Sequence, residues 1–222
     1  MSNKLKKIST SFQQWLLLIV GIAFIVTLVF LGQYQTKLFT DSANNLLNIY
    51  IKDVRHDIMD VTDKNLLILT RAVASEVNNA DKITSELLTG MLEKYNVTEI
   101  NYFSSTGVIL ASSNADFVGY DIGRGGVQAS EFWALLGAIT EYGQRFQPIG
   151  FDAKKSRKYA GVTLAAGGFI QVGYDEEAYY RAIEVAINEV VKNRHVGESG
   201  FLIVTDSAWR IISDRANNKN QP

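Results

Sequence analysis

The sequence predicts an α+β fold in which a long, membrane-anchored N-terminal helix carries an antiparallel sheet, followed by the start of a second lobe. Two observations lead to this prediction. The chain opens with an uncharged apolar stretch, and the segment from about residue 38 to 78 then contains neither proline nor glycine. Beyond it, short runs of alternating apolar and polar residues are separated by glycine-containing turns, as in β-hairpins.

The composition excludes several classes of function. The 222 residues have a formal net charge of -1, so there is no general excess of basic residues for binding nucleic acid. Cysteine is absent, and the two histidines, His56 and His195, lie far apart in sequence. No serine lies in a nucleophile-elbow pattern. We therefore expect no enzymatic activity, no metal site and no cofactor in this chain.

Residues 12–33 are predicted to form a transmembrane helix. No charged residue or histidine occurs in residues 8–36, and the apolar centre, residues 15–32, would span about 27 Å as a helix. Three lysines in residues 1–11 predict a cytoplasmic tail, which makes the following domain extracytoplasmic. A cleaved signal peptide is the alternative, but the apolar run is long for one and lacks an A-x-A site.

Residues 34–80 are predicted to form one long stalk helix. Its apolar residues follow a heptad spacing, which ends before Asn65. The seam either packs on the domain that follows or pairs with a second copy in a homodimer. Asn65 at its end either fixes the register of that dimer or is a solvated asparagine. The seam consists of Leu47, Ile51, Val54, Ile58 and Val61.

Residues 81–175 are predicted to form the main lobe. A helix over residues 82–95 would begin at Asp81 as N-cap and end at Asn96 in a left-handed conformation. The remaining elements follow in order. They are strands 98–103 and 108–111, a glycine-rich loop 119–126, a helix 130–139 capped by Ser130, strand 144–149, and a hairpin of strands 158–164 and 169–174.

The last strand of this hairpin has two different faces. Ile170, Val172 and Tyr174 alternate on one face, whereas Gln171 and Asp175 share the other with Phe169 and Gly173. A partly polar face opposite an apolar one suits the wall of a ligand pocket.

The element order, the hairpin around Gly107 and the strand ending VGYD before a helix resemble the extracytoplasmic Cache sensor domain, of the double Cache type. The resemblance covers roughly residues 38–175. It implies a PAS-like sheet that senses small molecules for chemoreceptors, histidine kinases, cyclic-dinucleotide enzymes or phosphatases. The runs RHVGESGFLIV and KYAGVTLAAGGFIQVGYD are most similar to sensor regions of stage-II-sporulation-type serine/threonine phosphatases.

Residues 176–222 are predicted to form a connecting helix, about residues 176–194, and an incomplete second lobe. After the helix, the run HVGESG precedes a strand pair, residues 201–205 and 210–213, and a polar tail. We expect a truncated chain whose output domain is absent. The alternative is a complete protein with a small C-terminal hairpin docked on the sheet.

The resemblance also implies ligand-binding residues. In amino-acid-binding members, an aspartate at the end of the last strand binds the amino group, and an arginine beside an aromatic residue binds the carboxylate. Asp175 matches the aspartate, but Arg124 and Trp133 are further apart than the family's pair, which weakens the match. Four of the candidates also have a structural alternative: helix capping for Asp175, core packing for Trp133, and surface strand positions for Tyr159 and Arg145. The candidate ligand-binding residues are Asp175, Arg124, Trp133, Arg145, Tyr159 and Gln171.

Together these patterns predict the sensing input region of a single-pass plasma-membrane signalling protein. The expected partner is a small anionic or zwitterionic metabolite, such as an amino acid or a carboxylate. The competing interpretation is a membrane-anchored scaffold or adhesion module that binds a partner protein.

Overall fold

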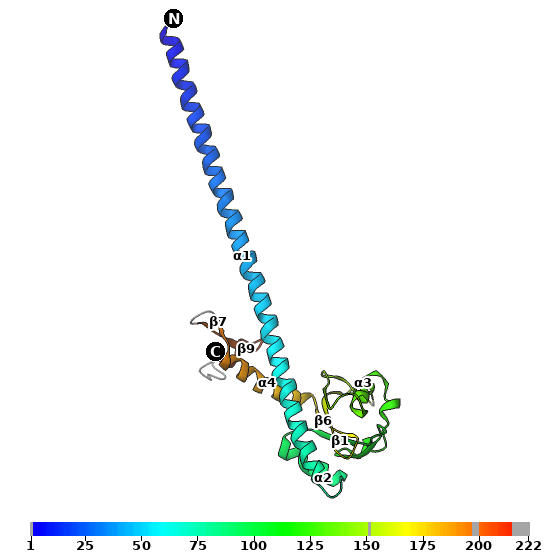
Figure 1. Ribbon diagram of the computed structural model, residues 1–222. Coiled ribbons are helices and arrows are strands. Elements are labelled where there is room, and N and C mark those ends of the chain that lie inside the picture. The colour runs from blue at the N-terminus through cyan, green and yellow to red at the C-terminus, as the bar shows by residue number, and fades with distance from the viewer. Residues whose placement is uncertain (1, 151, 197–199, 215–222) are drawn as a thin grey trace. The chain divides into compact units, whose positions relative to one another are not determined.

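The computed structural model describes residues 2–150, 152–196 and 200–214, with side chains from residue 12 onward. The chain divides into two compact units, residues 1–54 and 55–222. One helix, α1 (Ser2–Asn78), runs through the first unit and into the second (Figure 1). The predicted transmembrane and stalk segments are therefore parts of a single helix, which ends two residues before the predicted limit at 80.

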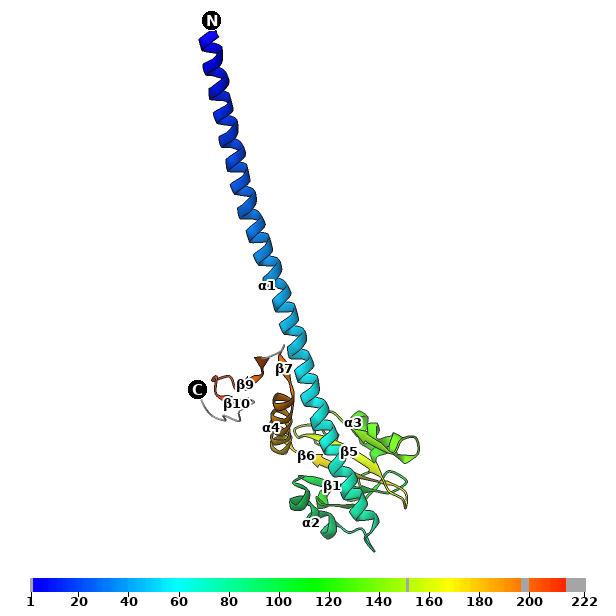
Figure 2. The ribbon, with the colours of Figure 1, turned by 60° about the vertical axis from the view of Figure 1, so that its left-hand side comes forward.

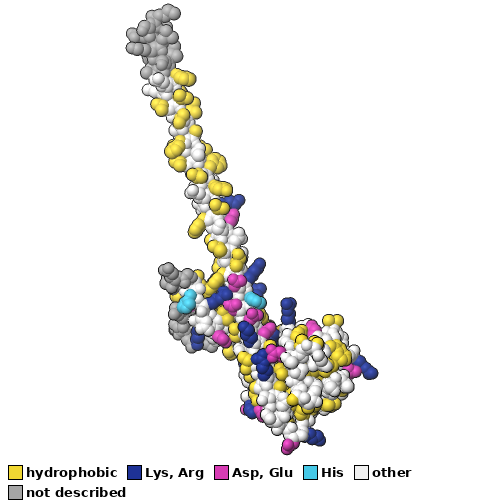
Figure 3. Space-filling view, viewed as in Figure 1, with side chains coloured by type: hydrophobic (Ala, Val, Ile, Leu, Met, Phe, Trp, Pro, Cys, Tyr) yellow, Lys and Arg dark blue, Asp and Glu magenta, His cyan; other side chains and the backbone are white. Residues whose placement is uncertain are grey.

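The first unit is the apolar part of α1. An 18-residue window has a mean hydropathy of 2.8, and none of it is buried against other residues. Apolar side chains are exposed along the visible face of this part of the helix (Figure 3). Thr27 and Thr36 donate their hydroxyl hydrogens to the carbonyl oxygens of Ala23 and Gly32, so these hydroxyl donors are satisfied within the helix. The helix is long and apolar enough to cross a membrane.

The second unit contains a six-stranded sheet whose paired strands are all antiparallel. The strand order is β2-β1-β6-β5-β3, and the short strand β4 also pairs with β5. This sheet and the long helix confirm the predicted α+β class. The strands are β1 (Glu99–Phe103), β2 (Ile109–Ser112), β3 (Glu141–Gly143), β4 (Gln147–Pro148), β5 (Ser156–Thr163) and β6 (Phe169–Tyr174).

One face of the sheet is covered by the C-terminal part of α1, by α2 (Ser85–Tyr95) and by α4 (Glu176–Asn193). Leu66, Val73 and Val77 of α1, which come after the predicted seam, are buried here, whereas Leu47 and Ile51 in the first unit are about half exposed. The core on this face includes Leu66, Val73 and Val77 of α1 with Ile100, Ile170 and Val172 of the sheet.

The other face is covered by residues 115–136, which we call the lid segment. It contains three 3₁₀ helices and one short α-helix: η1 (Ala115–Phe117), η2 (Ile122–Arg124), α3 (Gly126–Ser130) and η3 (Glu131–Leu136). Phe132 stacks on Phe169 and is fully buried. Helices thus cover both faces of the sheet. α1, α2 and α4 lie on one side, and the lid segment lies on the other (Figure 2).

Gly161 allows the lid segment to lie directly on β5. A Cβ atom there would lie 2.5 Å from Leu135 Cδ1 and 3.1 Å from the Phe132 ring. A larger residue would hold η3 away from the sheet.

Three predicted element boundaries are wrong. Helix α2 begins after Thr84, whose hydroxyl accepts a hydrogen bond from the Leu87 amide, and not after Asp81. Ser130 caps no helix, because its hydroxyl donates to the Val127 carbonyl oxygen. Of the predicted strand 144–149, only Gln147–Pro148 are strand, as β4, whereas β3 lies just before the predicted range; pairing with β5 sets both positions. The left-handed Asn96, with φ of 50°, is confirmed.

The final hairpin is confirmed. In its turn, Gly167 and Gly168 have φ values of +92° and +75°, which glycine adopts without steric cost. A Cβ atom on Gly168 would lie 2.0 Å from the Phe103 carbonyl oxygen, so glycine is also required for the close approach to β1.

The C-terminal residues form two separate two-stranded sheets. One joins β7 (His195–Val196) to β8 (Gly200–Phe201), and the other joins β9 (Ile203–Thr205) to β10 (Ile211–Asp214). Two predicted segments lie outside the described residues. They are the middle of the HVGESG break, residues 197–199, and the polar tail, which is not described from residue 215 onward.

Candidate functional site

A cavity of about 40 Å³ lies between the sheet and the lid segment. This volume is enough for roughly three water molecules. Its sheet side combines four polar side chains with Phe103 and Ile109, and its lid side is mostly apolar. The lining residues are Glu99, Asn101, Phe103, Ile109, Phe117, Tyr120, Ile122, Gln128, Ala129, Ile149, Tyr159 and Gln171.

The polar wall arises from strand alternation on three neighbouring strands. Glu99 and Asn101 are two residues apart on β1, so they share a face. Asn101 lies opposite Gln171 in the β1–β6 register, and Tyr159 comes from β5 on the other side of β6. All four residues are at most 6% exposed. Polar side chains from three strands therefore meet in the interior of the domain.

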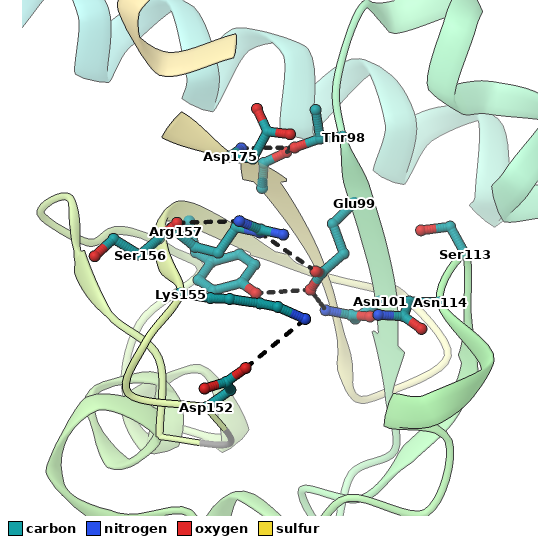
Figure 4. A network of polar contacts seen from close by, with 12 residues as sticks. Thr98, Glu99, Asn101, Ser113, Asn114, Asp152, Lys155, Ser156, Arg157 and Asp175 are labelled. Atoms are coloured by element: carbon teal, nitrogen blue, oxygen red, sulfur yellow. Dashed lines mark hydrogen bonds and ion pairs between the residues drawn. The ribbon is translucent and has the colours of Figure 1, made fainter. Parts of the chain in front are cut away.

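Glu99 is the centre of this group. Its Oε1 atom accepts hydrogen bonds from the Tyr159 hydroxyl and from Asn101 Nδ2, both at 2.7 Å. Its Oε2 atom lies 3.8 Å from Arg157 Nε, an ion pair beyond hydrogen-bond distance. Figure 4 shows Glu99 between Arg157 and Asn101. Burial raises the pKa of Glu99 above the usual carboxyl range, against the opposing effect of its hydrogen bonds.

Asn101 connects Glu99 to the neighbouring strands. Its Nδ2 atom donates to Glu99 and, at 3.0 Å, to Gln171 Oε1, while its Oδ1 atom accepts from the Ser112 hydroxyl at 2.6 Å. These partners determine the orientation of both amides. Gln171 thus uses its oxygen for Asn101, which leaves its Nε2 atom available at the cavity.

Gly173 makes the Tyr159–Glu99 contact sterically possible. A Cβ atom on Gly173 would lie 2.5 Å from Tyr159 Cε1. The Tyr159 ring therefore crosses β6 at the glycine to reach Glu99 on β1. Burial, followed by the nearby Glu99 carboxylate, raises the pKa of Tyr159 well above its usual value, so the hydroxyl stays a hydrogen-bond donor.

A second polar network attaches the lid segment to the sheet domain. Gln128 Nε2 donates to Gln144 Oε1 at 2.7 Å, and Gln144 Nε2 donates to Glu131 Oε2 at 2.7 Å. Glu131 also accepts a hydrogen bond from the Tyr142 hydroxyl. Burial and the Glu131 carboxylate raise the pKa of Tyr142 to about 12. Polar contacts of this kind can be exchanged for water if the lid opens.

Two of the six predicted ligand-binding residues, Tyr159 and Gln171, line the cavity. Asp175 caps α4, where Oδ1 accepts from the Ala178 amide at 2.9 Å, and Figure 4 shows it beside Thr98. The Arg124 side chain is 90% exposed and lies 3.8 Å from Asp121, and Trp133 is 45% exposed. The structure therefore does not bring Asp175, Arg124 and Trp133 to this cavity.

Arg145, the remaining predicted residue, lines a different cleft. This cleft lies on the α1 side of the sheet and has a volume of about 380 Å³. Here the buried Lys158 ammonium group contacts Asp63 of α1 and donates to the Gln144 carbonyl oxygen at 3.0 Å. It also lies 5.8 Å from the centre of the Tyr179 ring.

Sequence reasoning missed Glu99 and Asn101. The signal that could have identified them is their alternation: two polar residues share one face of a strand whose other residues are mostly apolar. In the part of the chain that the structure describes, no group of three potential metal ligands comes together.

No protein-family model matches the sequence, and no curated protein matches it either. Two solved structures resemble the fold weakly. An extracellular ligand binding receptor from Desulfohalobium retbaense DSM5692 is 14% identical over 59% of this chain and 24% of that chain, with a TM-score of 0.41. The sensor domain of the V. cholerae histidine kinase DctB is 19% identical over 70% of this chain and 59% of that chain, with a TM-score of 0.34. This chain thus spans less than two thirds of either structure.

Proposed function

We propose that this chain is the extracytoplasmic sensing region of a membrane-anchored signalling protein and that it binds a small polar metabolite in the cavity beneath the lid segment. The observation that carries the proposal is the polar cluster of Glu99, Asn101, Tyr159 and Gln171 at an internal cavity. The apolar part of α1 is the proposed anchor. We further propose that the signalling protein carries an output domain of one of the classes that the Cache resemblance implies.

The energetic cost of the cluster supports a binding role. Removing a carboxylate from water is unfavourable unless its hydrogen bonds are replaced, and Glu99 is only 3% exposed. One of its oxygens has hydrogen bonds from the protein, but the other has only the distant Arg157. A purely structural core would be served better by apolar side chains of similar volume. Groups with shifted pKa values in a cavity are typical of functional sites.

Strand β5 connects the cavity to α1. Arg157 and Tyr159 contact Glu99 on the cavity side of the sheet, whereas Lys158 between them contacts Asp63 of α1 on the opposite side. A displacement of β5 on ligand binding would therefore change the Lys158–Asp63 contact. The ligand can shift this equilibrium only by its differential affinity for the two arrangements.

A thermal-unfolding screen of the full chain in detergent, with a library of polar metabolites, tests the proposal. A ligand at about 100 times its dissociation constant should stabilise the domain by about 2.7 kcal/mol. The cavity-filling variant Ala129→Leu should lose this response, and Ala165→Leu, in the exposed hairpin turn, should keep it. No shift with any compound, from a demonstrably folded protein, would refute the sensor and favour the scaffold interpretation.

A further inference from the structure

The cavity offers hydrogen-bonding atoms that the described residues leave unused, and these atoms define the ligand's chemistry. The inference rests on the proposed sensing function and concerns the same site. The acceptor is Glu99 Oε2, which accepts no hydrogen bond from the described residues. The donors are Gln171 Nε2, which lines the cavity, and Arg157 Nε, which is not among the lining residues but lies beside Glu99, 3.8 Å from Oε2.

Both donors lack hydrogen-bond partners within the described structure. Gln171 is 6% exposed, and its amide oxygen is already bound to Asn101 Nδ2, so the remaining nitrogen presents two N–H groups. Arg157 Nε is buried without a hydrogen-bond partner, beside Glu99. A buried donor without a partner is unfavourable, which makes a bound group that accepts from it stabilising.

We propose that the ligand is a small neutral compound with several hydroxyl groups, such as a polyol or an aldose. A hydroxyl donates its hydrogen to Glu99 Oε2 and accepts hydrogen bonds from Gln171 Nε2 and Arg157 Nε. A carboxylate only accepts, and it would face the Glu99 carboxylate. An ammonium group only donates, and it would leave the two nitrogen donors without acceptors.

The charge balance of the site also favours a neutral ligand. Glu99 and Arg157 carry opposite charges 3.8 Å apart, and both side chains are largely buried. An added ion would be an unpaired charge in a site with little access to water, which is strongly unfavourable.

The opposite wall suits the carbon skeleton of such a compound. Phe117 and Ile122 of the lid segment, together with Ile149, present apolar surface to the cavity, against which C–H groups can pack. The volume of about 40 Å³ is small for a compound with several hydroxyl groups. Binding therefore requires the lid segment to move away from the sheet, which exchanges the Gln128–Gln144 contact for ligand or water.

Isothermal titration calorimetry on the full chain in detergent tests the ligand class. The probes are glycerol, erythritol, D-ribose and D-glucose, each compared with an analogue that lacks one hydroxyl, such as propane-1,3-diol or 2-deoxy-D-ribose. Serine, aspartate and malate represent charged ligands. We expect saturable binding of at least one neutral probe, weakened about tenfold or more when the contacting hydroxyl is removed. Saturation separates binding from the general stabilising effect of polyols.

Matched variants locate the contact. Arg157→Lys keeps the positive charge but removes Nε–H, so it should weaken binding about tenfold. Arg145→Lys makes the same change in the other cleft and should leave binding unchanged. Because the probe and its deoxy analogue are also compared on the unaltered chain, the result does not depend on the variants folding.

The outcomes distinguish the ligand class from the sensing function. Saturable binding of serine, aspartate or malate that Ala129→Leu abolishes, without binding of neutral probes, overturns the ligand class and leaves the sensing function intact. The proposed ligand class is also overturned if a neutral probe binds equally well without any one of its hydroxyl groups and equally well to Arg157→Lys. If no probe binds and the metabolite screen is flat, both proposals fail.

Discussion

Replacing Lys158 by methionine should destabilise the second unit measurably, because this side chain holds α1 against the sheet. Its ammonium group is buried and has three partners: the Asp63 carboxylate, the Gln144 carbonyl oxygen and the Tyr179 ring. Methionine keeps the apolar stem and removes all three interactions.

The magnitude follows from how much of each partner is buried. A hydrogen bond to a charged group contributes about 1.5–3 kcal/mol, and removing one partner of a fully buried ion pair costs about 3–5 kcal/mol. The Asp63 side chain is 43% exposed and can return to water, which reduces the cost. We therefore expect Lys158→Met to lower the free energy of unfolding by about 2–3 kcal/mol and Asp63→Asn by about 1 kcal/mol.

Urea unfolding of the full chain in mild detergent, followed by tryptophan fluorescence, measures these values. The double variant completes a thermodynamic cycle, in which we expect a coupling energy of about 1–2 kcal/mol between the two residues. Additive effects, or a loss below about 0.5 kcal/mol for Lys158→Met, would show that this contact does not join the sheet to α1.

Three further predictions concern the site, its charge and the stalk. Gly173→Ala should cost about 1–3 kcal/mol in urea unfolding, because its Cβ would lie 2.5 Å from the Tyr159 ring. Gly90→Ala, in an open helical position, should instead stabilise, and equal effects would contradict the steric argument. Burial raises the pKa of Glu99 in the folded state, so its contribution to stability is complete below the usual carboxyl range and is lost as pH rises through the raised pKa. The stability of the unaltered chain relative to Glu99→Gln should therefore fall with rising pH, and a flat difference would show that the carboxyl is not perturbed. A single cysteine in place of Ile51, in a chain without other cysteines, should form a crosslinked dimer in membranes on oxidation, whereas monomer at every seam position argues against pairing.

The elements that sequence reasoning identified depend on local patterns. The uncharged run predicts the N-terminal helix because it lacks charges and its centre is mostly apolar, and α1 begins at Ser2 and covers it. The glycine pair in the last hairpin requires positive φ values, so its turn could be located from the sequence. Asp175 was expected either to cap α4 or to bind ligand, and its hydrogen bond to the Ala178 amide supports the capping role.

The elements that it missed depend on partners distant in the chain. The predicted strand 144–149 is reduced to β4, and β3 forms before it at residues 141–143. Pairing with β5 decides which residues are strand here, and local propensity does not encode that pairing. The lid segment lies on the sheet because Gly161 leaves room for Leu135 and Phe132.

The sequence by itself therefore determined the helix that can span a membrane, the succession of hairpins and the two faces of the final strand, since each follows from side-chain periodicity and backbone preference. Only the tertiary structure decided which polar residues share a cavity. Tyr159 meets Glu99 across a separation of 60 residues, and this contact exists because β6 pairs between β1 and β5 with a glycine at the crossing point. The expected arginine and tryptophan lie elsewhere, because position in the sequence does not specify the direction in which a loop side chain points.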